Sequence, residues 1–277
     1  ATATVVAQYA YDTAGRLREE WDPRISPALK TAYTYDSAGR VATLTPPGEL
    51  PWTFTYGTAG GAATAGPGML LKASRPNLTA GTKSTTDGTT ATTSVVYDVP
   101  LTGTNAPNLM GTTDVGAWGQ TDVPTDATAV FPAPVSSAES PPSSNTGKDL
   151  AASDYKRATI TYTDASGRAV NTATPGGHVG MTEYDRFGNT IRELSAGNRE
   201  LAVATSGDGL AEQIALSIDQ MSKPDRAELL STRSVYSSDG LRESEEYGPL
   251  HQVTLTSTLQ AGSGGTDLPA GSQVPAR

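Results

Sequence analysis

The sequence predicts a mostly β protein in which antiparallel β-hairpins repeat along the chain and join into a curved spiral sheet, with a small helical insertion near residues 208–231. Three observations lead to this prediction. A motif of the form Tyr-x-Tyr-Asp-x-x-Gly-Arg recurs, and its Asp residues are spaced 24 and 21 positions apart in successive copies. Short runs of alternating Tyr, Val and Thr are interrupted by turn-forming residues, as in proteins with many short strands. The 277 residues include 29 Gly and 19 Pro, which favours turns over long helices.

The repeated motif has two near-ideal copies, from Tyr9 to Leu17 and from Tyr33 to Val41. Two further copies lie around Asp164 and Asp185, and a weaker one follows Tyr236. The residues that we assign to the motif are Tyr9, Tyr11, Asp12, Gly15, Arg16, Tyr33, Tyr35, Asp36, Gly39, Arg40, Tyr162, Asp164, Gly167, Arg168, Tyr184, Asp185 and Gly188.

Each part of the motif has a physical role in a hairpin. Tyr-x-Tyr places two rings on one face of a strand, because side chains alternate with a period of two. The Asp carboxylate can accept hydrogen bonds from backbone amides of the turn, and Gly supplies the positive φ that closes it. We expect the following Arg to face outward or to pair with a carboxylate. One copy is therefore one hairpin, and it must pair with neighbours because an isolated hairpin cannot bury its apolar face.

These residues resemble the YD repeat of RHS proteins, which also occurs in the BC components of insecticidal toxin complexes and in teneurins. The segments between the repeats resemble those of actinobacterial members. The resemblance implies a large spiral sheet that closes into a hollow shell, in many members around a C-terminal toxic domain. The family's core-ending Asp-Pro-x-Gly motif is missing, since Asp22-Pro23 is followed by Arg24, so its self-cleavage cannot be carried over.

The resemblance and the repeat pattern divide the chain into seven segments. We expect YD-repeat hairpins at 1–56, degenerate repeat strands at 57–98 and a Pro/Ser-rich extended connecting segment at 99–147. Further YD-repeat hairpins follow at 148–200, then a helical insertion at 201–233, a degenerate YD repeat at 234–260 and a linker-like tail at 261–277.

Composition excludes several classes of function. The net charge is −9 and Lys and Arg are not clustered, so the electrostatic footprint of a nucleic-acid-binding protein is missing. No apolar run is long enough to insert across a membrane. With no Cys and only two His, His178 and His251, neither a thiolate nor a His-rich metal site can form. We expect no cofactor, no metal and no enzymatic activity.

Two functions remain open for the chain. The first is a structural segment of an RHS-type β-shell that encapsulates or displays a C-terminal, toxin-like domain of a large secreted bacterial protein. Its partner would be further YD-repeat sequence, from the same polypeptide or another chain, together with an encapsulated toxin domain. The alternative is a cell-surface or cell-wall-associated adhesion module that binds carbohydrate or a neighbouring cell, for which Trp21, Trp52 and Trp118 are the candidate stacking platforms.

Overall fold

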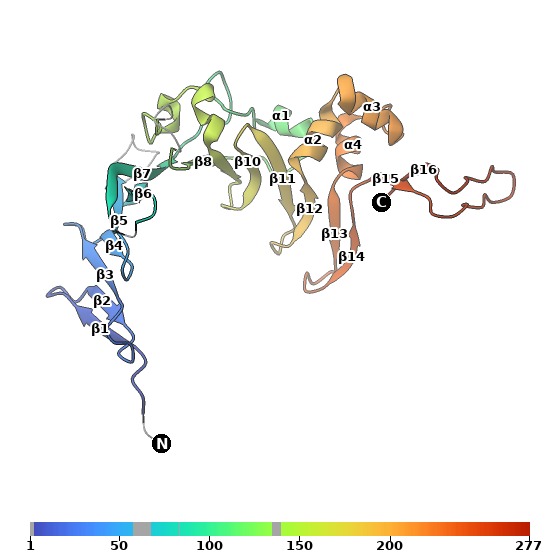
Figure 1. The fold of residues 1–277 in the computed structure, drawn as a ribbon. Helices are drawn as coiled ribbons and strands as arrows, with labels where there is room; N and C mark the ends of the chain where they lie inside the picture. Colours follow the sequence, from blue (N-terminus) through green and yellow to red (C-terminus); the bar gives the residue numbers. More distant parts are fainter. Residues whose placement is uncertain (1–2, 58–67, 83, 135–139) are drawn as a thin grey trace. The chain divides into compact units, whose positions relative to one another are not determined.

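The computed structural model describes residues 3–57, 68–82, 84–134 and 140–277. These residues form two compact units (Figure 1). The first unit contains residues 1–99 and 128–150, and the second contains residues 100–127 and 151–277. The mostly β, antiparallel fold predicted from the sequence is confirmed, with a few short helices in addition.

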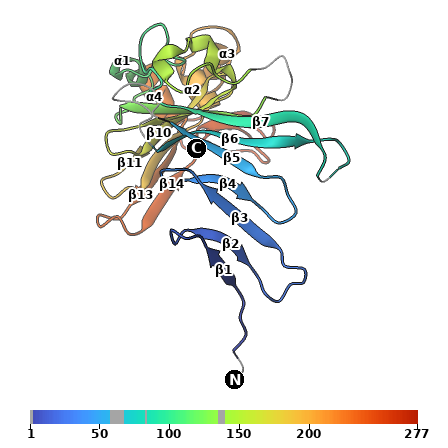
Figure 2. The ribbon, with the colours of Figure 1, turned by 90° about the vertical axis from the view of Figure 1, so that its left-hand side faces the viewer.

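The first unit is a meander of hairpins in which every strand pairs with the next one along the chain (Figure 2). Its strands are β1 (Gln8–Tyr11), β2 (Leu17–Trp21), β3 (Lys30–Tyr35), β4 (Val41–Thr45), β5 (Trp52–Gly57), β6 (Met69–Leu78) and β7 (Thr86–Val96). Part of β8 (Asp126–Phe131) pairs with the end of β7, and the short 3-10 helix η1 (Gly147–Asp149) follows later.

The second unit continues with antiparallel hairpins: β9 (Thr159–Thr163), β10 (Ala169–Thr174), β11 (His178–Tyr184), β12 (Thr190–Leu194), β13 (Thr232–Tyr236) and β14 (Glu243–Tyr247). The helices are α1 (Thr112–Gly116), the 3-10 helix η2 (Ala152–Arg157), α2 (Ala196–Val203), α3 (Gly207–Ala215) and α4 (Lys223–Leu229). In Figure 1, α2, α3 and α4 lie at one end of strands β11 to β14, and the β11–β12 and β13–β14 turns lie at the other. A separate pair, β15 (His251–Thr254) and β16 (Gln273–Ala276), completes the unit.

The two units differ in how deeply their strands are buried. In β1 to β6, none of the described residues is buried, and most are half-buried. In the second unit, one face of β9 to β12 is covered, and Ile160, Tyr162, Met181 and Leu194 on that face are at most 3% exposed. Strands β1 to β6 therefore depend more on contacts between neighbouring strands than on a central core.

The structure differs from the predicted segments in three places. The connecting segment 99–147 contains the strand β8, which reads as loop in sequence because Pro residues flank it closely; residues 135–139 of this segment lie outside the described residues. Helix α2 begins at Ala196, inside the segment predicted to contain only hairpins, ahead of the expected helices α3 and α4. The predicted linker-like tail contains β16, whose pairing with β15 is a contact between distant residues that local composition does not reveal.

Candidate functional site

The candidate site is the turn of each hairpin together with the strand of the next hairpin that lies against it. At the first turn, Asp12 Oδ1 accepts hydrogen bonds from the amides of Ala14 and Arg16, both at 2.9 Å. The Gly15 amide donates to the Asp12 carbonyl at 3.0 Å, and Gly15 has φ of 80°. Only glycine adopts this conformation without a steric cost, which is why the motif requires it here.

The same turn forms at the other motif copies. Asp36, Asp164 and Asp185 each accept through Oδ1 from the amides two and four residues later, at 2.8–2.9 Å. At Asp12 and Asp36, the backbone amide four residues later lowers the carboxyl pKa most strongly, and the side chain of the same Arg lowers it further. Each of these carboxylates holds the backbone of its own turn, which is a structural use.

A β-bulge follows the turn in each hairpin that carries the Asp-x-x-Gly motif. In the first hairpin, Tyr11 pairs with Leu17 but Ala10 pairs with Glu19, so Arg18 is the extra residue. The ladder from β2 to the next hairpin begins only at Glu19, which pairs with Ala32. Leu17 therefore lies beyond the paired region, and its carbonyl receives no backbone partner from β3.

A tyrosine from the next hairpin fills this gap. The Tyr35 hydroxyl donates to the Leu17 carbonyl at 2.6 Å. The same bond recurs from Tyr184 to the Ala169 carbonyl and from Tyr97 to the Leu70 carbonyl, both at 2.9 Å. Each acceptor is the residue just before the bulge of the preceding hairpin.

The motif arginine completes the contact. Arg16 Nε donates to Asp12 Oδ2 at 2.8 Å, and its guanidinium carbon lies 4.6 Å from the centroid of the Tyr35 ring. The corresponding guanidinium-to-ring distances are 4.9 Å for Arg40 over Tyr56 and 5.2 Å for Arg168 over Tyr184. We call this set of Asp, Arg and next-hairpin Tyr the inter-hairpin junction.

Comparison with known proteins agrees with this repeat geometry. Residues 11–50, which include the first junction, match the family model described as RHS Repeat. Residues 11–50 are therefore similar to an RHS repeat. No curated protein matches the chain.

Several solved structures show a distant similarity to the chain. The crystal structure of TcdB2-TccC3-TEV is 16% identical, with a TM-score of 0.28 over 68% of this chain and 10% of that one. The Tc holotoxin pore of Photorhabdus luminescens, with a mutation in TccC3, is 15% identical, with a TM-score of 0.27 and the same coverage. The crystal structure of TcdB2-TccC3 is 11% identical, with a TM-score of 0.28 over 86% of this chain and 12% of that one. The chain thus spans about a tenth of the length of the first two of these proteins.

One residue assigned to the RHS motif lies on the opposite face from the rest. Tyr162 is two positions before its Asp, whereas Tyr11, Tyr35 and Tyr184 are one position before theirs. A shift of one residue turns a side chain to the other side of the sheet. Tyr162 is accordingly 0% exposed on the covered face, where its hydroxyl accepts from Asn108 Nδ2 at 3.0 Å, and burial raises its pKa to about 12.

The covered face of the second unit also contains a buried ion pair that the sequence did not indicate. Arg192, 4% exposed, donates to Glu183 Oε2 at 3.2 Å and to the carbonyls of Trp118 and Gly119 at 3.0 and 3.1 Å. Glu183 accepts from the Thr121 amide at 2.7 Å. The pair fastens the segment after α1 to the sheet. Glu183 and Arg192 are on strands whose sequence shows only the repeated hairpin pattern, so only the fold brings them to this segment.

The three candidate sugar-stacking tryptophans have different surroundings. Trp118 is 5% exposed, its indole nitrogen donates to Gln120 Oε1 at 2.9 Å, and Arg199 lies 5.1 Å from its ring. Its ring is thus closed to a sugar, which removes Trp118 from the candidate stacking platforms. Trp21 and Trp52 are half-buried, with Lys30 and Arg75 at 4.6 and 5.6 Å from their rings.

In the parts of the chain that the structure describes, no group of three or more His, Cys, Asp or Glu side chains could hold a metal ion. None of the described helices has both the length and the apolar character required to cross a membrane.

Proposed function

We propose that the chain is a structural segment of an RHS-type β-shell that encloses or displays another domain of a large secreted bacterial protein. The observation that carries the proposal is the inter-hairpin junction, which recurs in both units with nearly the same distances. It uses the acidic, basic and aromatic side chains of the repeat to join hairpins. Side chains engaged in these contacts hold neighbouring hairpins together, which is a structural and not a catalytic use.

The two outer strands support the expectation of further repeat sequence as a partner. Among the described residues, β1 pairs only with β2, and β14 pairs only with β13. Tyr9 and Tyr11 on β1 are 53% and 59% exposed, whereas Tyr33 and Tyr35, at the same motif positions one hairpin later, are half-buried. Open strand edges with exposed aromatic rings favour pairing with another strand. The hairpin that covers Tyr11 would supply the Arg of one more junction.

The test is the association of the chain with itself in solution. Sedimentation velocity of residues 1–277 over a wide concentration range should show concentration-dependent association through the open edges. The variant Tyr9→Lys/Tyr11→Lys should weaken it, because charged side chains on an edge strand oppose pairing. The matched control Ile214→Lys, which changes a residue 57% exposed on α3, should associate like the native chain. A chain that stays monomeric at the highest concentration would contradict the proposal.

A carbohydrate-binding surface is the second candidate function, and one observation favours it. Trp52 lines a hollow of 280 Å³ in the first unit together with Arg75 and Asn77, which gives an aromatic ring beside polar groups. Such surfaces hold sugars by stacking and hydrogen bonding. A glycan array probed with the native chain and with Trp52→Ala tests it: binding that Trp52→Ala removes would favour adhesion over a purely structural role.

A further inference from the structure

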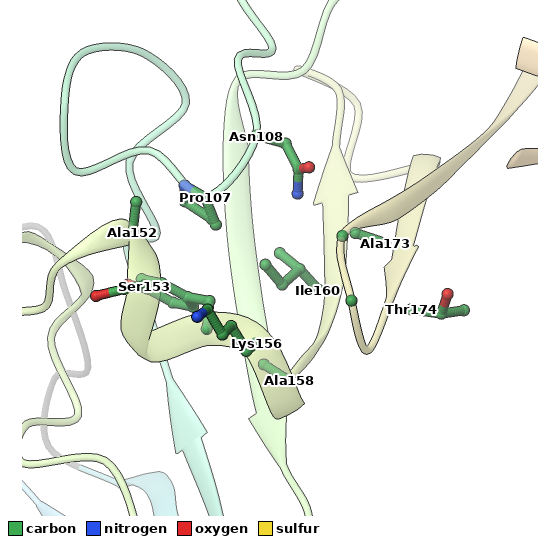
Figure 3. A pocket seen from close by; sticks show the side chains of 12 residues that line it. Pro107, Asn108, Ala152, Ser153, Lys156, Ala158, Ile160, Ala173 and Thr174 are labelled. Carbon is green, nitrogen blue, oxygen red and sulfur yellow. The ribbon is translucent and has the colours of Figure 1, made fainter. Parts of the chain in front are cut away.

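The second unit contains a pocket of about 290 Å³ that the wall function does not use (Figure 3). Its floor is apolar and belongs to the covered face of the sheet: Ala158, Ile160 and Ala173 are 1%, 2% and 0% exposed. Figure 3 shows Asn108 and Pro107 on the loop opposite, with Lys156 on the helix beside them. The volume corresponds to roughly ten water molecules and is at the small end of ligand-binding pockets.

The frame of this pocket is fixed by hydrogen bonds. The amide of Gly176 donates to the carbonyl of Lys156 at 2.9 Å, which ties the β10–β11 turn to η2. Asn108 is held by its bond to Tyr162. Gly177 has φ of 86°, a conformation that favours glycine, and a Cβ built on it would lie 3.5 Å from Asn108 Oδ1. Because Gly177 has no side chain, the rim of the pocket on this side consists of backbone. A pocket with such a frame exists before any ligand arrives.

The charge of the pocket is opposite to that of the protein. Lys156 is the single charged residue among those that line the pocket, in a chain whose net charge is −9. The side chain of Lys156 is exposed. Among the described residues, no carboxylate forms an ion pair with its ammonium group. The neighbouring Asp154 carboxylate accepts instead from the Ala151 amide at 2.9 Å. An apolar floor with one ammonium group at the rim favours a ligand that has an apolar part and a single negative charge.

We propose that this pocket binds a small carboxylate with an apolar body, of about the size of an N-acylated apolar amino acid. The apolar part contacts Ile160, Ala158 and Ala173, and the carboxylate pairs with Lys156. This site is separate from the inter-hairpin junctions, and the proposal stands whether or not the chain forms a shell.

The test is a titration of the full 277-residue chain with N-acetyl-L-phenylalanine, followed by amide NMR. The expected Kd is on the order of 1 mM, because a ligand with few atoms has little binding energy to offer. The shifted signals should include the amides of Gly176 and Gly177 and the Asn108 side-chain amide. The neutral analogue N-acetyl-L-phenylalaninamide should bind about threefold more weakly, as expected for the loss of one partly exposed ion pair.

Three variants make the test specific. Lys156→Gln should remove the preference for the acid over the amide and still bind both. Lys148→Gln, a matched change at an exposed lysine outside the pocket, should keep the preference. Ala152→Leu, which places a larger side chain at the pocket wall, should abolish binding of both compounds.

Several results would overturn the proposal. These are the absence of shifts up to about 10 mM ligand, well above the expected Kd, equal affinity for acid and amide in the native chain, and shifts that map away from the pocket. If Ala152→Leu does not fold, as judged by its circular dichroism spectrum, the Lys156→Gln comparison and the shift map still decide the outcome.

Discussion

The inter-hairpin junction predicts a measurable coupling between Arg16 and Tyr35. Replacing Tyr35 with Phe removes the hydroxyl that donates to the Leu17 carbonyl at 2.6 Å but keeps the ring. We expect a loss of about 1 kcal/mol, the usual net value of such a hydrogen bond. Replacing Tyr35 with Leu also removes the ring that lies 4.6 Å from the Arg16 guanidinium, which adds about 0.5–1 kcal/mol at a partly exposed site.

A double-mutant cycle isolates the ring contact. Arg16→Met, Tyr35→Leu and the double variant should give a coupling free energy of about 0.5–1 kcal/mol. With Tyr35→Phe in place of Tyr35→Leu, the coupling free energy should vanish, because Tyr and Phe both present an aromatic ring to the Arg16 guanidinium. Hydrogen exchange at the amides of β2 and β3 measures the local free energy of opening, which suits strands in which no residue is buried.

The control cycle combines Lys148→Met with Tyr35→Leu. Lys148 lies on η1 in the same unit and has no part in the junction, so these two changes should be additive within about 0.3–0.5 kcal/mol. If the Arg16 and Tyr35 changes are equally additive, the arginine does not join the hairpins, and the motif would be explained by its turn alone.

The remaining predictions concern the turn, the buried ion pair and acid. Gly167→Ala, at φ of 76°, should destabilise the β9–β10 hairpin by about 1–2 kcal/mol, measured by urea denaturation; an unchanged midpoint would contradict the strain argument. Arg192→Met should cost about 3–5 kcal/mol, because it leaves the Glu183 carboxylate buried without its cation, and adding Glu183→Gln should recover part of the loss. The pKa values of Asp12 and Asp36 are lowered in the folded state, so their stabilisation is present at neutral pH and is lost as the pH falls below their ordinary pKa of 3.8. NMR titration of their carboxyl carbons should show both midpoints below that value, and a midpoint above it would refute the assignment.

The local part of the repeat could be predicted from the sequence. Asp and Gly act within five residues of chain, so the turn at Asp36 and Gly39 follows from spacing alone, and the structure has it as expected. The pairing of Arg40 with the Asp36 carboxylate was among the expected alternatives and is present at 2.7 Å. The contact of Arg40 with Tyr56 was not predicted, because it depends on the bulge that separates neighbouring hairpins, and nothing in the motif marks the bulge.

Contacts between distant segments account for what the sequence did not show. Helix α2 could not be separated from the hairpin before it, because its start at Ala196 directly follows the last residues of β12. The strand β16 is recognisable only through its partner β15, about twenty residues earlier in the chain. The pairing of Arg192 with Glu183 requires the register of β11 and β12, in which Glu183 is directly opposite Arg192.

The residue two positions before the turn Asp distinguishes the two units. In the first unit this position is Ala10 or Thr34, and neither is buried. In the second unit it is Tyr162 or Glu183, and both are buried beneath the loop and segment that include Asn108 and Thr121. The turn Asp and Gly are the same in both units, and the junction of Asp164, Arg168 and Tyr184 repeats that of the first unit, although Asn189 takes the place of the Arg in the Asp185 hairpin. The turn therefore sets how hairpins join, and this one alternate position sets whether their other face can be covered. A sequence rule for these hairpins should therefore assign the faces from the position of each aromatic residue relative to the Asp, as the burial of Tyr162 two positions before Asp164 shows.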